Sequence, residues 1–303
     1  MPAGEISPAA AWERDGTQRA LDSLFSLAHQ YKSSRSYHDL LKFVARFRFY
    51  SPFNAMLIHI QMPGAKYVAP PHRWRRDYGR SIKSGARPIV ILQPMGPVMF
   101  VFDVIDTEPM DGARPLPPEV DRPFEVTQGR IGDELGQTAQ NAKRDGVEVI
   151  EREAGSQQAG LIRGNTSGVL LEFVTRTRPE RVSITVQKRF EIALNAKLSA
   201  EARYATLVHE LGHLYCGHLG TPDERWWPDR RGLRYEVREL EAESVCYLVC
   251  ERLGIRSPSA EYLANCLRDD VEMPSISLDC VMKTAGLIEQ MGRERLGPRG
   301  RAR

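Results

Sequence analysis

Apolar residues recur at helical spacing through the first part of the chain. From Thr17 to about Tyr50 they fall three or four positions apart, the period that gathers them on one face of a helix. Ser51-Pro52 interrupts this pattern, because proline lacks the amide hydrogen that a continuing helix needs. Phe53–Gln61 then predicts a second, shorter helix that ends before Pro63-Gly64.

Two strand-like runs follow, Ile89–Leu92 and Val98–Val104. Met95-Gly96-Pro97 lies between them and predicts a hairpin. Farther along, apolar spacing predicts a helix over Ile131–Arg144. The remaining runs predict strands at Val147–Ile150, Val169–Phe173 and Val182–Val186, and helices at Ala260–Asp269 and Cys280–Met291.

Another helical pattern carries the first candidate chemistry. Ser199 is a candidate N-cap and Gly217 a candidate stop. Between them, His209-Glu210-Leu211-Gly212-His213 places two imidazoles four residues apart, on one helix face, where both can reach one metal ion. Glu210 lies about 100° farther round, within reach of a metal-bound water and not of the metal itself. The alternative is a helix with two buried core histidines and a surface glutamate, which would have the same sequence.

A further helix is predicted over Arg234–Leu253, and it is apolar on most of its faces. Glu239 and Glu243 nevertheless lie four residues apart on one stripe of it. A buried carboxylate is costly unless it is paired or binds a metal. Glu239 is therefore the candidate third ligand, and Glu243 the candidate acceptor for the outer N–H of a ligand histidine. The alternative is a solvated face on which these acids pair with Arg238 and Arg252.

The two helices together resemble the zincin metallopeptidases, and among them the ImmA/IrrE group. HELGHLYCGH is similar to that group's first metal helix. RELEAESVCYLVCERLGI is similar to its second helix, and still more to the same segment of the ArdC antirestriction proteins. The resemblance implies a Zn²⁺ site with His209, His213 and Glu239 as ligands and Glu210 as general base. Glu243 takes the orienting place and is also the alternative ligand, because the sequence does not fix which carboxylate faces the metal.

A peptidase also needs a group that stabilises the oxyanion of the tetrahedral intermediate. Tyr215, Tyr235 and His218 are the candidates, and the sequence does not choose among them. His218 follows His213 by five residues. The metzincin pattern requires a third histidine six residues after the second, so His218 is interpreted as a residue near the site and not as a ligand.

Bulk composition limits the classes of protein. With 42% apolar and 27% charged residues, the chain has the composition of a globular protein. No apolar run approaches the roughly 20 residues of a membrane helix, and the first residues lack the apolar core of a secretion signal. A cytoplasmic location without membrane contact is the expectation. The cysteines, five in number and scattered, do not suggest a disulfide framework.

Charge is unevenly distributed. Residues 41–100 carry a net charge of +9 with Asp77 as their one acid, which leaves −6 for the rest of a chain whose total is +3. Aromatic residues are interleaved with these cations, a combination that suits phosphates and unpaired bases. A small domain with a solvated basic face is the alternative. The predicted nucleic-acid contacts are Arg46, Arg48, Lys66, Arg73, Trp74, Arg75, Arg76, Arg80, Lys83 and Arg87.

The same segment resembles the N-terminal single-stranded-DNA-binding domain of ArdC-type proteins. The stretches that carry this resemblance are YSPFNAMLIHIQ, Trp74–Gly85 and VMFVFDVIDTEP. Where that family has a Lys-Gly-Glu turn, this chain has Lys83-Ser84-Gly85-Ala86. The resemblance implies single-stranded DNA as a partner.

The expected fold class is α+β, a zincin-like metallopeptidase domain preceded by a small α/β nucleic-acid-binding domain. The predicted division is a disordered segment at 1–16, the ArdC-like domain at 17–106, a Pro-rich linker at 107–123, the metallopeptidase domain at 124–291 and a basic disordered tail at 292–303.

Three functions follow from these patterns. The first is a zinc metalloendopeptidase acting on a regulatory or DNA-associated protein whose identity the sequence does not give. The alternative is a non-proteolytic antirestriction protein that binds single-stranded DNA and keeps a structural or vestigial metal site. A third is a protease that cleaves a transcriptional repressor, as the ImmA/IrrE resemblance implies. No glycine-rich phosphate loop is present, so no nucleotide cofactor is expected.

Overall fold

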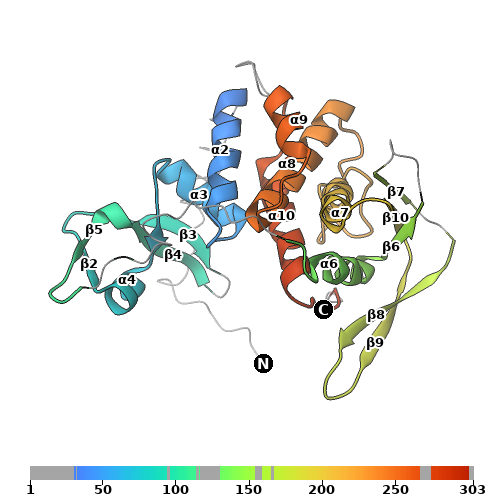
Figure 1. Ribbon diagram of the computed structural model, residues 1–303, viewed down its shortest axis with the longest axis horizontal. Coiled ribbons are helices and arrows are strands. Elements are labelled where there is room, and N and C mark those ends of the chain that lie inside the picture. Colours follow the sequence, from blue (N-terminus) through green and yellow to red (C-terminus); the bar gives the residue numbers. More distant parts are fainter. Residues whose placement is uncertain are drawn as a thin grey trace, which may run out of the picture. The chain divides into compact units, whose positions relative to one another are not determined.

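The structure is a computed structural model that describes residues 31, 33–93, 96–113, 116, 130–153, 159–164, 167–266 and 274–299. The described residues up to 116 belong to one compact unit, and those from 130 onward belong to a second. The predicted disordered segment 1–16, the helical pattern before residue 31 and most of the predicted linker lie outside the described residues. Helices and strands are mixed in both units (Figure 1).

The first unit contains α2 (Ser34–Arg46), α3 (Pro52–Gln61), β1 (Val68–Ala69), α4 (Pro71–Tyr78), β2 (Arg80–Ile82), β3 (Ile89–Gln93), β4 (Gly96–Asp103) and β5 (Thr107–Pro109). The side chains of Ser33 and Ser51 cap α2 and α3 by accepting backbone N–H bonds. Strand β4 pairs antiparallel with β3, which confirms the predicted hairpin, and with β1 on its other side. Helix α3 is apolar on nearly all faces because it lies between α2 and β3.

Trp74 lies in the core of the first unit. Its side chain is fully buried against Tyr67 and Ala69, and its indole N–H donates to the Phe102 carbonyl oxygen at 2.9 Å. This corrects the expectation that Trp74 contacts nucleic acid, because a buried ring offers no face to a base. The prediction was wrong because Trp74 lies among arginines in the sequence. Of the residues of α4, Trp74 is the one that is buried.

The start of the predicted linker is part of this unit. Strand β5 pairs antiparallel with β2, with Ser81 opposite Glu108. Arg80 fixes the pair by donating from Nε to the Thr107 hydroxyl at 2.6 Å and from Nη2 to its carbonyl oxygen at 2.9 Å. The first unit therefore extends beyond residue 106, where the sequence had placed its end.

The second unit contains α6 (Glu134–Ala142), β6 (Val147–Arg152), β7 (Gly160–Gly164), β8 (Leu170–Arg176), β9 (Val182–Gln187), β10 (Phe190–Asn195), α7 (Ala200–Tyr215), α8 (Tyr235–Leu253), α9 (Ser259–Cys266) and α10 (Leu278–Arg293). Helices α7, α8 and α10 pack on one another, and α6 packs on α10 and α7 (Figure 1).

A three-stranded sheet borders α7. Strand β10 is central, parallel to β6 and antiparallel to β7, and α7 packs against β10 and β7. The sequence predicted β6, β8 and β9 but neither β7 nor β10. Strands β8 and β9 pair only with each other among the described strands and form a separate antiparallel hairpin (Figure 1). Strand β7 is thus an edge of the sheet beside α7.

The residues after α10 are held in place. Leu296 is buried, and Arg299 donates from Nε and Nη2 to the two carboxylate oxygens of Asp145 at 2.7 and 3.0 Å. The Arg299 guanidinium also lies over the rings of Trp226 and Trp227. In the described part of the predicted disordered tail, residues 292–299, Leu296 and Arg299 are therefore held against the second unit, while residues 293–295, 297 and 298 are exposed.

None of the described helices combines the length and apolar composition that crossing a membrane requires.

Replacing Gly217 with alanine is expected to lower the free energy of unfolding by about 1–3 kcal/mol from backbone strain alone. Gly217 has φ of +85°, and an added Cβ would lie 2.1 Å from the Pro228 carbonyl oxygen. Urea denaturation measures the loss. Gly232→Ala is the control in the same loop, because nothing lies within 4 Å of its added Cβ. Equal stability of the two variants would contradict the role of Gly217.

Candidate metal centre

Helix α7 presents His209 and His213 side by side. The Ser199 side chain accepts the Ala202 N–H and fixes where the helix begins, as predicted. The two imidazoles are one turn apart with ring centroids separated by 4.8 Å, and their Nε2 atoms face each other at 3.1 Å. Two nitrogens that bind one ion at about 2.1 Å can lie up to about 4.2 Å apart, so this separation fits a shared metal.

Glu239 on α8 completes the set. Its Oε1 lies 3.4 Å from His213 Nε2, and its Oε2 lies 3.7 Å from His209 Nε2. One ligand atom from each of His209, His213 and Glu239 falls within 4.8 Å of the other two. Two imidazoles and one carboxylate form a donor set that zinc uses in catalytic sites, with a fourth position left open. The residues present therefore fit a divalent metal ion.

Burial shifts the pKa values of two of these candidate ligands. It is the largest cause of the lowered pKa of His213, which is about 3, and the neighbouring His209 and His218 lower this pKa further. His213 is thus a neutral imidazole, the form that binds metals. Burial also raises the pKa of Glu239, an effect that His209 opposes and the charge of Glu243 reinforces. A metal ion would relieve this cost, because it favours the charged carboxylate.

Glu243 lies on the other side of the His209 ring. Its Oε1 is 3.6 Å from His209 Nδ1, the nitrogen that points away from Glu239. The structure therefore brings Glu239 to the two facing Nε2 atoms and Glu243 to the outer nitrogen, the arrangement in which Glu239 binds the ion and Glu243 orients a ligand. At 3.6 Å this outer contact is longer than a hydrogen bond.

Glu210 is next to the cluster but outside it. Its Oε2 accepts the Ile162 N–H of β7 at 3.1 Å, so α7 and the edge strand are joined at this carboxylate. Burial raises the pKa of Glu210, although His209 and the Ile162 amide oppose the change. A carboxylate with a raised pKa, close to a metal and not bound to it, is suited to accept a proton near neutral pH.

The three candidate oxyanion stabilisers differ in position. Tyr215 is fully buried, and its hydroxyl donates to Asp145 at 2.8 Å. His218 is also buried, and its Nδ1 lies 3.0 Å from the Nδ1 of His213. It therefore lies on the side of the His213 ring opposite the Nε2 atom that faces His209. Neither can reach a bound substrate, which corrects both expectations. Tyr235 is 64% exposed, one helical turn before Glu239, and it is the candidate that the structure leaves available.

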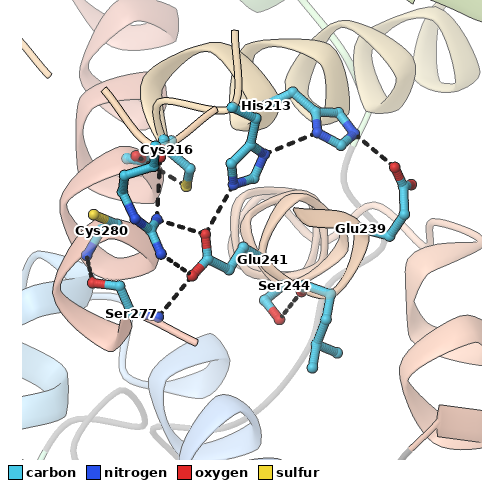
Figure 2. A network of polar contacts seen from close by, with 11 residues as sticks. His213, Cys216, Glu239, Glu241, Ser244, Ser277 and Cys280 are labelled. Atoms are coloured by element: carbon cyan, nitrogen blue, oxygen red, sulfur yellow. Dashed lines mark hydrogen bonds and ion pairs between the residues drawn. The ribbon is translucent and has the colours of Figure 1, made fainter. Parts of the chain in front are cut away.

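Sequence reasoning missed a network behind His213. His218 Nε2 lies 2.9 Å from Oε2 of Glu241, which is fully buried and bound by Arg230 (Figure 2). Glu239 and Glu241 lie at opposite ends of a chain of imidazoles, both from α8. The available signal was the spacing of Glu241 from Val237, Val245 and Leu248, which puts it on an apolar side of α8 where a carboxylate needs a partner.

The basic residues of the first unit are mostly accessible. Arg75, Arg76, Arg80 and His72 line a hollow of about 680 Å³ beside α4 and β2. The aromatic residues counted with them are largely core, since Phe43, Phe47 and Tyr67 are buried, while Phe49 is 53% exposed. Of the nine predicted basic contacts, Arg48, Arg73 and Arg80 are half-buried and the rest are exposed: Arg46, Lys66, Arg75, Arg76, Lys83 and Arg87.

Comparison with known proteins gives few matches. No protein-family profile matches the chain, and no curated protein matches it. Among solved structures, the chain is similar to two crystal structures of the antirestriction protein ArdC from plasmid R388. The metal-free structure shows 16% identity and a TM-score of 0.33, over 80% of this chain and 82% of that one. The Mn(II)-bound structure shows 15% identity and a TM-score of 0.36, over 85% and 95%.

These are proteins of the kind that the sequence resemblance names. At such low identity and TM-score, neither carries an argument about the site. The interpretation of the metal centre therefore rests on the residues of this chain.

Replacing His209 or His213 with alanine is expected to abolish stoichiometric binding of Zn²⁺. Glu239→Ala is expected to weaken binding more than Glu243→Ala, because a lost ligand costs more than a lost orienting partner, which typically costs about 10–100-fold. Metal analysis and chelator competition on the four variants measure this. Loss of the metal in Glu243→Ala with retention in Glu239→Ala would reverse the roles of the two carboxylates.

Proposed function

We propose that the second unit is a zinc-dependent peptidase. The observation that carries the proposal is the convergence of His209, His213 and Glu239, with Glu210 half-buried beside them and outside the ligand set. A purely structural site has no need of such a base. Zinc is chosen because two imidazoles and a carboxylate are ligands it accepts in hydrolytic sites.

When bound, the metal would lower the pKa of its water and polarise the scissile carbonyl. Glu210 accepts the proton of the attacking water and returns it to the leaving amine. The Ile162 amide holds one oxygen of Glu210, which leaves the other for that water. Strand β7, as an edge of the sheet, offers backbone groups with which an extended peptide can pair. The protein substrate is not identified by any of these features.

A second candidate is a non-proteolytic antirestriction protein that binds single-stranded DNA; the similar ArdC structures are of an antirestriction protein. The basic hollow on the first unit favours it. The Arg75 and Arg76 side chains are exposed there, and Arg80 is fixed by Thr107. Guanidinium groups bind phosphate oxygens well. In this candidate the metal centre is structural, and Glu210 has no chemical role. The two functions can also coexist in one chain.

Replacing Arg75 and Arg76 with alanine together is expected to weaken binding of single-stranded DNA and flatten its salt dependence. Each lost phosphate contact lowers the slope of log K against log salt by about 0.7 for single strands. Fluorescence anisotropy at several salt concentrations measures this in the full chain. The control with the same charge change is Arg225→Ala with Arg231→Ala, two exposed arginines of the second unit. A DNA affinity that does not change with salt concentration, or an equal loss of affinity in the two double variants, would contradict a DNA-binding role for Arg75 and Arg76.

Replacing Glu210 with glutamine is expected to leave zinc bound and to abolish hydrolysis, with losses of about 10²–10⁴-fold. The change is nearly isosteric and removes only the ability to accept a proton. Self-cleavage and cleavage of proteins bound to the same DNA are the first assays. Glu236→Gln is the control, an exposed glutamate at the start of α8. Unchanged activity in Glu210→Gln with zinc retained would replace the peptidase by the antirestriction candidate.

A further inference from the structure

The outer nitrogen of His213 begins a buried chain of polar contacts. His213 Nδ1 lies 3.0 Å from His218 Nδ1, and His218 Nε2 lies 2.9 Å from Glu241 Oε2. His218 and Glu241 have side chains that are 1% and 0% exposed (Figure 2). Because neither side chain is accessible to solvent, the hydrogen-bonding role of each is determined by its protein partners.

Glu241 is the fixed end of the chain. Arg230 donates from Nη1 and Nη2 to its two oxygens, both at 2.7 Å, and the Ser277 N–H donates to Oε1 at 2.7 Å. With the Arg230 guanidinium and the Ser277 amide donating to its two oxygens, Glu241 is a carboxylate that only accepts hydrogen bonds.

Cys216, His218 and Glu241 also lie close enough to suggest a second metal site. Two contacts argue against one. Arg230 already engages both oxygens of Glu241, so a cation is in place. Burial raises the pKa of the Cys216 thiol, which donates to the Thr284 hydroxyl at a Sγ–Oγ1 distance of 3.6 Å. A thiol that stays protonated is not a metal ligand.

The charge of Glu241 determines the tautomers along the chain. His218 donates its Nε2–H to the carboxylate, so the Nδ1 of neutral His218 is an acceptor. Only one proton can lie between the two facing Nδ1 atoms, and it then belongs to His213. His213 with its proton on Nδ1 has a lone pair on Nε2, the atom that faces His209 and Glu239.

We propose that His218 and Glu241 are positioning residues that hold His213 in the tautomer whose Nε2 can bind the metal. The proposal rests on the metal centre proposed above and adds the residues that set its geometry. The corresponding contact on the other histidine is looser, since Glu243 lies 3.6 Å from His209 Nδ1. His213 is accordingly the ligand whose orientation the fold determines before metal arrives.

The test measures metal affinity and tautomer separately from activity. His218→Ala and Glu241→Gln are expected to weaken Zn²⁺ binding by about 10–100-fold in chelator competition. His218→Asn is expected to recover part of the loss, because its side-chain oxygen can accept the His213 N–H. In metal-free wild-type protein, ¹⁵N NMR of the imidazoles is expected to show His213 protonated on Nδ1, and His218→Ala is expected to lose this preference.

The matched control is Glu289→Gln. Glu289 is buried and bound by Arg252 in the same unit, in a pair that includes no candidate ligand. It is expected to lower the temperature of unfolding as Glu241→Gln does and to leave zinc affinity unchanged. Equal loss of affinity in both variants would overturn the proposal, as would wild-type affinity in a folded His218→Ala variant. So would His213 protonated on Nε2 in the metal-free protein.

Failure of this proposal is distinguishable from failure of the peptidase. Tight zinc binding that depends on His218, in a protein without hydrolytic activity, supports the positioning role and removes only the peptidase. Hydrolysis that survives in His218→Ala with unchanged zinc affinity supports the peptidase and removes only the positioning role.

Discussion

The close contact between α7 and α8 at Gly212 is the constraint on which the metal centre depends. A Cβ added to Gly212 would lie 3.3 Å from the Ala242 Cα and 3.4 Å from its carbonyl oxygen, so the two helix backbones approach about as closely as glycine permits. At this separation short side chains can meet across the interface. The neighbours of Ala242 on α8 then project past both sides of the contact, Glu241 towards His218 and Glu243 towards His209.

The described buried acids of the second unit, Asp145, Glu191, Glu241 and Glu289, each have a basic partner. Glu241 and Glu289 are bound by arginines, and Asp145 is bound by Arg299 and by the Tyr215 hydroxyl. Glu239 is half-buried and differs, because the partners of its carboxylate are the imidazoles of His209 and His213, and burial lowers the pKa of His213. Since a buried carboxylate requires a positive partner, Glu239 is the acid that calls for a cation from outside the chain.

Elements with a strong local pattern could be predicted from the sequence. Helices α7 and α8 combine a capping serine or a terminal glycine with a long apolar face, and the two histidines and the glutamates followed directly from their spacing. Strand β10 could not be found this way, because Glu191 and Asn195 interrupt its apolar run. Glu191 is tolerated there only because Lys188 and Arg163 bind it. Strand β7 begins and ends with glycine, which is typical of a loop. The positions of Trp74, Tyr215 and Arg299 depend on partners far away in the chain, which no local pattern reports.

The ion pair between Arg299 and Asp145 joins residues 154 positions apart. Closing so long a segment costs chain entropy that local contacts must first offset. The helix that carries the histidines ends at Tyr215, which binds the same aspartate. Folding of the second unit is thus expected to fix the C-terminal end of α7 late, together with α10.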